Sequence, residues 1–304
     1  MTTLETALAA LVLFHSALGC HRARADGAAD QTPRRLPPPE AQLVAFHGPD
    51  GSAELMKGFL YLPPGKGPFP AVLWNHGSEA APGWQAELAR FYNGQGFVFF
   101  IPHRRGHGQS PGAYIMDRIK EIPSQMKDPA DGERRFVALQ EEAGRDVGAA
   151  LAALKRVPEV DPKRIVMSGV SFGGIQTLIA AEKGLGVRAF VAFAPGAMAW
   201  AKVSALGERL HRAVKGAKAP VLVVQAQNDY DLAPARALAD DLSRRGDGSA
   251  AKIYPAFGTT NQEGHGAFAA TREGIAIWGA DVLAFFKQRG GVGGPSAAMA
   301  PRNP

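Results

Sequence analysis

Residues 164–174 read RIVMSGVSFGG, and this stretch decides the fold. A short apolar run, Ile165–Ser168, leads into the tight turn GVSFG and then into a segment of helical period. A G-x-S-x-G turn between a strand and a helix lifts its serine above the end of a sheet, and the helix directs its free N–H groups toward that serine. The stretch therefore predicts that Ser171 is a nucleophile.

A second copy of the same pattern, GQSPG, lies at residues 108–112. The residue after a nucleophilic serine must donate its backbone N–H to the oxyanion that forms on the attacked carbonyl. Here that residue is Pro111, which has no N–H, and no clear helical segment follows. Ser110 is therefore predicted to be a loop residue.

Outward from residues 164–174, apolar runs of strand length alternate with segments of helical period. Several runs, such as VFFI and VLVV, are apolar at every position, which is typical of strands in a parallel sheet covered on both faces. The alternation predicts one α/β domain with a mostly parallel, eight-stranded sheet and helices on both faces, an arrangement that resembles the α/β-hydrolase fold.

The expected strands are Leu43–Phe46, Phe59–Leu62, Ala71–Asn75, Phe97–Ile101, Ile165–Ser168, Ala189–Phe193, Val221–Gln225 and Lys252–Tyr254. The expected helices are Trp84–Asn93, Arg135–Arg156, Phe172–Lys183, Trp200–Val214, Pro234–Arg245 and Arg272–Lys287.

A serine nucleophile needs a base, normally histidine, and in this fold the histidine follows the serine in the chain. After Ser171 the candidates are His211 and His265. His211 falls within a predicted amphipathic helix, where a surface histidine is the ordinary interpretation. His265 lies in the glycine-flanked segment EGHG between the last strand and the final helix. A glycine-flanked loop at that place predicts His265 as the base.

The carboxylate that orients the histidine is expected after the strand Val221–Gln225, where two aspartates compete. Asp229 stands where the loop leaving the strand presents a side chain. Asp231 is nearer to Pro234 and is placed to cap the following helix. We therefore expect Asp229 to be the acid, with Asp231 as the alternative.

The sequence WNHGS at residues 74–78 ends another predicted strand. The loop after this strand supplies the second N–H of the oxyanion hole in the α/β-hydrolase fold. Ser78 is the expected donor through its backbone, together with the N–H of Phe172. His76 is expected to brace the loop, since it precedes the nucleophile in the chain.

Five motifs together resemble the dienelactone hydrolase-like branch of the α/β-hydrolases: NHGS at Asn75, PHRRGHGQSPG at Pro102, GVSFGG at Gly169, QNDYDLAP at Gln227 and EGHGAF at Glu263. The resemblance covers nearly all of the predicted domain. It implies a catalytic triad of Ser171, Asp229 and His265, an oxyanion hole at Ser78 and Phe172, and no metal or organic cofactor. True dienelactone hydrolases use cysteine where Ser171 stands, so dienelactone itself is not expected as the substrate.

The resemblance implies a carboxylic-ester hydrolase that acts on a small-molecule ester through an acyl-enzyme. GVSFGG is also similar to the catalytic domain of prolyl-oligopeptidase-type peptidases, so a small serine peptidase or amidase is the alternative. An inactive hydrolase-fold binding protein is a third interpretation, which the intact serine, aspartate and histidine oppose. Tyr114, Met116, Met198 and Trp200 are candidates either for an apolar acyl site or for core packing.

The formal net charge of the chain is +6, but its Lys and Arg residues are scattered and form no basic run, which argues against a nucleic-acid partner. Arg104 and Arg105 could attract an acidic substrate, although anchoring of their loop is the commoner role. Cys20 is the one cysteine, so an intrachain disulfide and a cysteine-based metal site are excluded. The oligomeric state leaves no signal in the sequence.

The first 25 residues are predicted to be an export signal. The apolar run Ala7–Leu18 is too short to span a membrane, which takes about 20 residues. An A-x-A pattern follows at residues 23–25, while Ala17–Cys20 resembles a lipoprotein box with Cys20 as the lipidated residue. Glu5 and the lack of an early Lys or Arg point instead to a simple extension, which would leave the protein in the cytoplasm.

A proline-rich linker at residues 26–40, a hydrolase domain at 41–289 and a flexible tail at 290–304 complete the predicted organisation. With export, the protein would be periplasmic or secreted.

Overall fold

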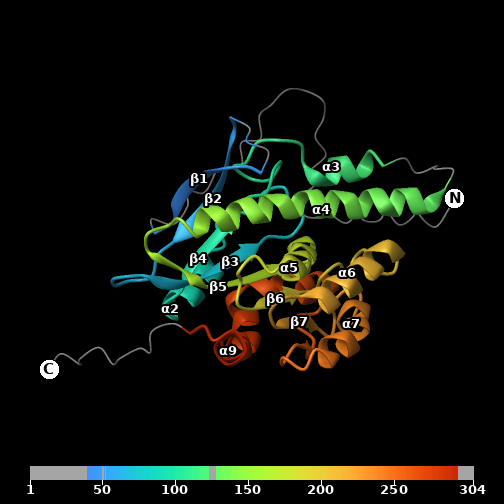
Figure 1. The fold of residues 1–304 in the computed structure, drawn as a ribbon. Coiled ribbons are helices and arrows are strands. Elements are labelled where there is room, and N and C mark those ends of the chain that lie inside the picture. The colour runs from blue at the N-terminus through green and yellow to red at the C-terminus, as the bar shows by residue number, and fades with distance from the viewer. Residues whose placement is uncertain (1–39, 50, 52, 123–127, 294–304) are drawn as a thin grey trace.

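The computed structural model describes residues 40–293 except 50, 52 and 123–127. Its centre is an eight-stranded sheet with the strand order β1-β2-β4-β3-β5-β6-β7-β8 (Figure 1). The strands β3 to β8 run parallel to one another, while β2 pairs antiparallel with both β1 and β4. The predicted α/β fold with a mostly parallel sheet is thus confirmed.

The eight strands are β1 Gln42–His47, β2 Leu55–Tyr61, β3 Phe69–Asn75, β4 Val98–Pro102, β5 Val160–Val170, β6 Phe190–Phe193, β7 Val221–Ala226 and β8 Ala250–Tyr254. The helices are α2 Ala86–Gly94, α3 Ile115–Lys120, α4 Pro129–Leu154, α5 Phe172–Lys183, α6 Ser204–Gly216, α7 Ala233–Arg244, the short α8 Phe268–Ala270, and α9 Arg272–Gln288, with a π-helical turn η1 at Glu263–Ala267.

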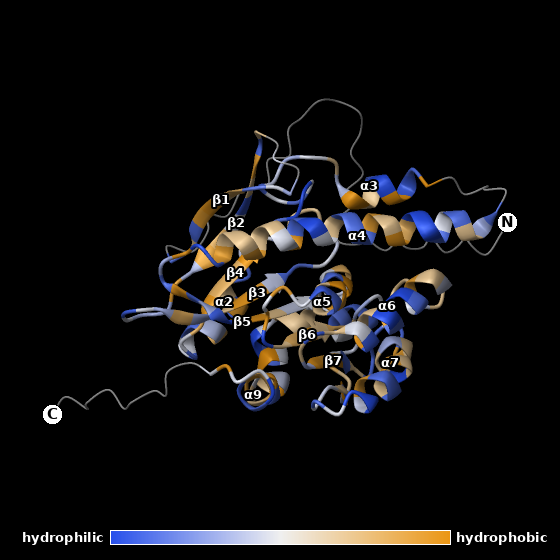
Figure 2. Cartoon of the chain, viewed as in Figure 1, coloured by the Kyte–Doolittle hydropathy of each residue, from blue (hydrophilic) through white to orange (hydrophobic). Residues whose placement is uncertain are grey.

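Alternate side chains of the inner strands fill two separate cores, because successive residues of a strand point to opposite faces of the sheet. On β5, Ile165 and Met167 pack in one core with residues of α4, α5, α6 and α7. Val166 faces the other way and packs with residues of α2 and α9, including Trp278. Figure 2 shows the apolar strands enclosed by helices whose outward faces are hydrophilic. The continuous apolar character of the strands is therefore explained by burial on both faces.

Some helix boundaries differ from the expected ones. The longest helix, α4, begins at Pro129 instead of Arg135, because the Asp128 carboxylate accepts a hydrogen bond from the Ala130 N–H (3.0 Å) and Pro129 fits the first turn. Helix α6 begins at Ser204 instead of Trp200. Helix α3 was not expected from the sequence.

Beyond α9 the chain stays packed as far as Val292, which is buried among residues of the second core. The predictions for residues 1–25, 26–39 and 294–304, including Cys20 and the export signal, lie outside the described residues and stay predictions. Among the helices that the structure describes, none has the length and apolarity needed to cross a membrane.

The parallel strands all end at the same edge of the sheet. The loops that follow β3, β5, β7 and β8 meet at this edge, and each of them carries one or more of the predicted site residues. In open α/β sheets, ligands bind in the crevice outside these carboxyl ends. The fold therefore directs attention to this edge.

Candidate active site

The turn between β5 and α5 holds Ser171 in a strained backbone conformation, with φ 56° and ψ −116°. Its N–H donates to the Phe193 carbonyl on the neighbouring strand at 2.9 Å. A Cβ added at Gly173 would lie 2.0 Å from the Asn75 carbonyl oxygen, so only glycine lets α5 begin so close to the end of β3. The turn predicted from residues 164–174 is present, and the strain presents Ser171 at the sheet edge.

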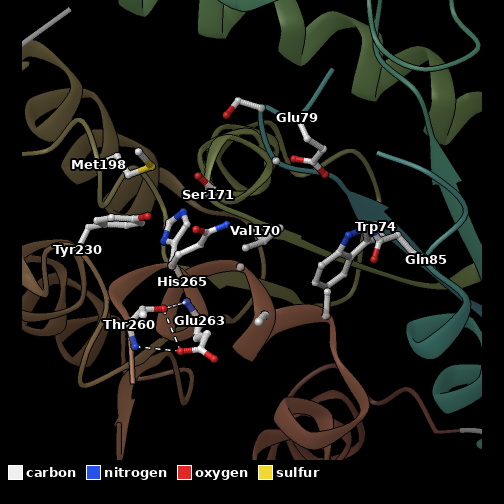
Figure 3. Close-up of a pocket in the computed structure, with 16 residues that line it drawn as sticks. Trp74, Glu79, Gln85, Val170, Ser171, Met198, Tyr230, Thr260, Glu263 and His265 are labelled. Atoms are coloured by element: carbon white, nitrogen blue, oxygen red, sulfur yellow. Dashed lines mark hydrogen bonds between the residues drawn. The ribbon is translucent and has the colours of Figure 1, made fainter. Parts of the chain in front are cut away.

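His265 and Asp229 are joined by a hydrogen bond of 2.7 Å between Nδ1 of the imidazole and Oδ1 of the carboxylate. The other imidazole nitrogen, Nε2, is buried and has no hydrogen-bond partner among the described residues. His265 and Ser171 line the same cavity (Figure 3). The structure thus brings together the three residues that the sequence predicted, with one histidine nitrogen held by the carboxylate and the other left available.

Two side chains that the sequence analysis did not single out position this pair. Gln225, at the end of β7, donates to Oδ2 of Asp229 at 2.9 Å and so fixes the rotation of the carboxylate. Asn228 donates to the carbonyls of Phe257 and Thr260 and accepts from the Phe257 N–H, all within 2.9 Å. Asn228 therefore ties the loop after β7, which carries Asp229, to the loop that follows β8.

The local conformation around His265 differs from the predicted loop. His265 lies in the π-helical turn η1, which continues into α8. A Cβ at Gly264 would lie 2.4 Å from Oδ1 of Asn228, so this glycine allows the turn to pack directly on the Asn228 side chain. Of the two glycines that suggested an open loop, Gly264 instead permits close packing of a helical turn, while a Cβ at Gly266 would meet no atom within 4 Å.

The loop after β3 is held by Arg104, a buried residue of the loop after β4. Its guanidinium donates to the carbonyl oxygens of His76 (2.9 Å) and Gly77. In a trans peptide the C=O and the following N–H point in opposite directions. The Ser78 N–H is therefore directed away from Arg104, and Ser78 lines the cavity beside Ser171. The Tyr114 hydroxyl adds a hydrogen bond to the Ser78 carbonyl.

The second N–H of the predicted oxyanion hole belongs to Phe172, the first residue of α5. The first N–H groups of a helix have no intrahelical acceptor and carry its positive dipole end. The predicted donors, Ser78 and Phe172, thus flank Ser171 from two different elements.

Three buried histidines, His76, His103 and His107, surround Arg104. Burial is the largest cause that lowers the pKa of each, and the Arg104 charge lowers it further; the pKa of His107 falls to about 3. Nε2 of His76 accepts from the Arg104 N–H at 3.2 Å, and its Nδ1 lies 2.9 Å from the Gly77 carbonyl. His76 is therefore placed to brace the loop as a neutral side chain.

The alternatives weighed in the sequence lie elsewhere. The Ser110 hydroxyl is buried and donates to the His103 carbonyl at 2.6 Å. Asp231 accepts from the Ala233 N–H at 2.8 Å, at the start of α7. His211, on α6, contacts Asp241 on α7 at 2.7 Å. Each has a structural partner, and none of the three lines the cavity at Ser171.

The cavity beside Ser171 has a volume of about 420 Å³. Its walls combine apolar side chains, among them Trp74 and Val170, with the carboxylates of Glu79 and Glu263 (Figure 3). The described residues that line it include no Lys or Arg. Glu263 is occupied by hydrogen bonds from the N–H groups of Thr259 (2.8 Å) and Thr260 (2.9 Å).

The Glu79 carboxylate lies over the backbone of Gly77, since a Cβ there would be 2.5 Å from Oε2 of Glu79 and 3.8 Å from Cβ of Ser171. Burial raises the pKa of Glu79, and hydrogen bonds from backbone N–H groups offset part of that effect. The sequence analysis missed Glu79, although it stands directly after the NHGS motif.

Within the part of the chain that the structure describes, no group of three or more His, Cys, Asp or Glu could hold a metal ion.

Comparisons with known proteins bear on the fold and the family of the chain. A search of curated proteins finds no match. Among solved structures, a Pyrococcus horikoshii acylaminoacyl peptidase is 17% identical with a TM-score of 0.60, over 86% of this chain and 43% of that one. A Pyrococcus furiosus esterase is 16% identical with a TM-score of 0.58, over 82% of this chain and 91% of that one. At such identities the likeness shows the fold, and the chain spans less than half the length of the peptidase.

The family model of the dienelactone hydrolase family matches residues 56–289. This range runs from β2 to the end of α9 and includes every predicted site residue. The chain belongs to the dienelactone hydrolase family.

Proposed function

We propose that this protein is a serine hydrolase that cleaves carboxylic esters of small molecules through an acyl-enzyme, with Ser171, His265 and Asp229 as its catalytic triad. The observation that carries the proposal is His265. Its Nδ1 is held by Asp229 at 2.7 Å, and its buried Nε2 has no partner among the described residues. The same cavity is lined by Ser171, whose backbone is held at a positive φ.

In the first half-reaction, Ser171 Oγ attacks the carbonyl carbon of the ester while Nε2 of His265 takes the hydroxyl proton. Asp229 stabilises the imidazolium. The negative charge on the carbonyl oxygen is stabilised by the N–H groups of Ser78 and Phe172. His265 then gives its proton to the alcohol oxygen, which leaves and forms the acyl-enzyme.

In the second half-reaction, a water molecule attacks the acyl carbon and gives a proton to His265. Collapse of this intermediate returns the proton to Ser171 Oγ and releases the carboxylic acid. These steps use side chains, backbone N–H groups and water.

A second candidate is the hydrolysis of aminoacyl amides or peptides by the same residues. The Glu79 carboxylate in the cavity supports it, because a carboxylate is the natural partner for the ammonium group of such a substrate. Amide leaving groups require fuller protonation by His265 than alcohols do.

The test is covalent labelling with a fluorophosphonate, followed by mass spectrometry of the peptide that contains Ser171. We expect a single adduct on Ser171. Hydrolysis of p-nitrophenyl acetate is then compared with that of an aminoacyl p-nitroanilide. Because the activated ester is intrinsically far more reactive than the anilide, turnover of the ester with none of the anilide supports the esterase, and turnover of the anilide supports the peptidase. A folded protein that neither reacts with the probe nor hydrolyses either substrate would be an inactive binding protein.

A further inference from the structure

Two cavities of very different size meet at Ser171. Ser171, Ser78 and Met198 line both of them. The larger one, described above, contains His265 and Glu79. The smaller one has a volume of only about 30 Å³ and is a slot between α3, α4, α5 and the turn after β6. The residues that complete the walls of the slot are Met116, Phe136, Phe172, Ile175, Gly196 and Ala199.

The proposed chemistry decides which part of an ester enters each cavity. His265 must protonate the oxygen of the departing alcohol, so the alcohol has to lie on the side where His265 is. His265 lines the large cavity and does not line the slot. With the carbonyl carbon at Ser171 Oγ and its oxygen between Ser78 and Phe172, the acyl substituent points away from His265. The slot is the other space that opens at Ser171, and it borders the proposed oxyanion donors Ser78 and Phe172.

We infer, on the basis of the proposed esterase function, that the slot is the acyl site and that the protein hydrolyses acetyl esters of larger alcohols. The slot offers about 30 Å³ against about 420 Å³ in the large cavity, so acetyl, the shortest of these acyl groups, is the one that it holds with the least displacement of its walls. The alcohol has more than ten times that space in the other cavity.

Part of the slot wall consists of side chains that are buried on helices. Phe136 of α4 and Ile175 of α5 are each only 2% exposed, and Met116 of α3 is 3% exposed. Close-packed interiors resist the insertion of extra methylene groups. Met198 is partly exposed in the turn after β6, and its unbranched side chain makes it the most adaptable wall.

The slot is also apolar. Among the described residues that line it, Ser78 and Ser171 are the only ones with polar side chains, and Glu79 lies in the other cavity. An ammonium group on the acyl part would be buried there without a partner, at a large cost in binding. The same slot therefore favours an uncharged acetyl group over an aminoacyl group.

The test is a chain-length panel of p-nitrophenyl acetate, propionate, butyrate and hexanoate with the full chain. We expect kcat/KM to fall by about tenfold or more for each methylene that the slot cannot hold. Met198→Ala and, as a second variant, Met116→Ala remove a wall and should move the best substrate to butyrate or hexanoate. Met56→Ala is the matched control, because Met56 is a buried methionine of the same core that lines neither cavity.

The outcomes separate this inference from the proposed function. Equal or better turnover of butyrate and hexanoate by the wild type overturns the acyl slot and leaves the esterase intact. So does an unchanged acetate preference in both slot variants when they fold as the Met56→Ala protein does. If Ser171 is not labelled by a fluorophosphonate and no ester is hydrolysed, the esterase proposal itself fails.

Discussion

The two copies of G-x-S-x-G in this chain adopt different structures. Ser110 lies in a turn against β2, where its hydroxyl donates to the His103 carbonyl (2.6 Å) and accepts from the Lys57 N–H (2.9 Å). Ser171 lies between a central strand and a helix, with a positive φ and its side chain at a cavity. The difference shows that the strand and helix around a G-x-S-x-G motif decide whether its serine is exposed to a cavity. The Ser110 hydroxyl is engaged by the backbone both as a donor and as an acceptor, so it is not available to attack a substrate.

A histidine pair repeats this contrast. His76 and His265 each stand next to a glycine at the sheet edge, and both are buried. Both nitrogens of His76 face backbone groups, whereas Nε2 of His265 has no partner among the described residues. Of the two serines and the two histidines, the ones that line the cavity are Ser171 and His265, whose side chains are not fully occupied by backbone groups.

The largest expected effect is that of removing the nucleophile. Ser171→Ala should lower kcat for p-nitrophenyl acetate by about 10⁴–10⁶, as losses of triad serines do. Ser110→Ala should leave kcat within a few-fold but lower the free energy of unfolding by about 1–3 kcal/mol, because it leaves buried backbone groups unpaired. Kinetics and urea unfolding of both variants measure this. Full activity in Ser171→Ala would refute the assignment.

The second largest effect on kcat is expected from a substitution at one of the two aspartates after β7, Asp229 and Asp231. Asp229→Asn should reduce kcat by about 10⁴, because an amide no longer stabilises the imidazolium or its tautomer. Asp231→Asn alters only a helix start and should change kcat less than tenfold. The pH profile of kcat is measured for both. A larger loss of kcat in Asp231→Asn than in Asp229→Asn would mean that Asp231, and not Asp229, orients His265.

A smaller effect is expected for Arg104, which holds the loop after β3. Arg104→Lys replaces two donors held in a fixed fork by a single ammonium, so the Ser78 N–H loses its orientation. We expect kcat to fall about 10²-fold with KM little changed, which is the loss seen when one oxyanion donor is removed. The control is Arg105→Lys, since Arg105 pairs with Asp146 at 3.0 Å. Equal losses of kcat in the two variants would mean a general loss of structure.

The Glu79 carboxylate should weaken the binding of anionic alcohols in the large cavity. At a pH above the raised pKa of Glu79, Glu79→Gln removes one negative charge. A unit charge about 10 Å away in a medium of effective dielectric about 20 corresponds to roughly a tenfold change in affinity. We expect kcat/KM to rise by that factor for an acetate ester with a carboxylate on the alcohol, and to stay constant for an uncharged one. Equal changes for both esters would exclude charge recognition by Glu79.

The histidines beside Ser110 should make the fold sensitive to acid. The lowered pKa of His107, about 3, means that the unfolded chain binds a proton below pH 6.5 that the folded chain does not bind. The contribution of His107 to the free energy of unfolding is thus fully present above pH 6.5 and is lost as the pH falls from 6.5 toward 3. Between pH 7.5 and 5.5, His107 should lower the free energy of unfolding by about 1.4 kcal/mol.

Urea unfolding at the two pH values checks this for the wild type and for His107→Gln, which should lose that part of the pH dependence. His47→Gln, at an exposed position of β1, is the control and should behave as the wild type does. A wild type that is equally stable at both pH values would contradict the lowered pKa of the buried histidines.

The sequence predicts the architecture well because the decisive signals are local. An apolar run such as Val221–Gln225 predicts a buried strand by itself. The turn around Ser171 is predicted from the glycines that neighbour it in the sequence. The order of serine, aspartate and histidine along the chain then points to Asp229 and His265 without any knowledge of distances.

The contacts that the sequence could not predict join segments remote in the chain. Arg104 reaches the carbonyl of His76 only because β4 and β3 are neighbours in the sheet. The π-helical turn at His265 depends on the packing of Gly264 against Asn228. Glycine beside histidine indicates a loop by propensity alone, and tertiary packing overrides it.

The hydrogen bonds of Asn228 have a consequence for how the site tolerates change. They tie the loop that carries Asp229 to the loop that leads to His265, so these two residues move together. Ser171 belongs to a different part of the fold, the junction of strand β5 and helix α5. A distortion that shifts these two parts relative to each other alters the separation between serine and histidine and preserves the pairing of histidine with aspartate. In the proposed mechanism, proton transfer from Ser171 to His265 is therefore the step most sensitive to such a distortion.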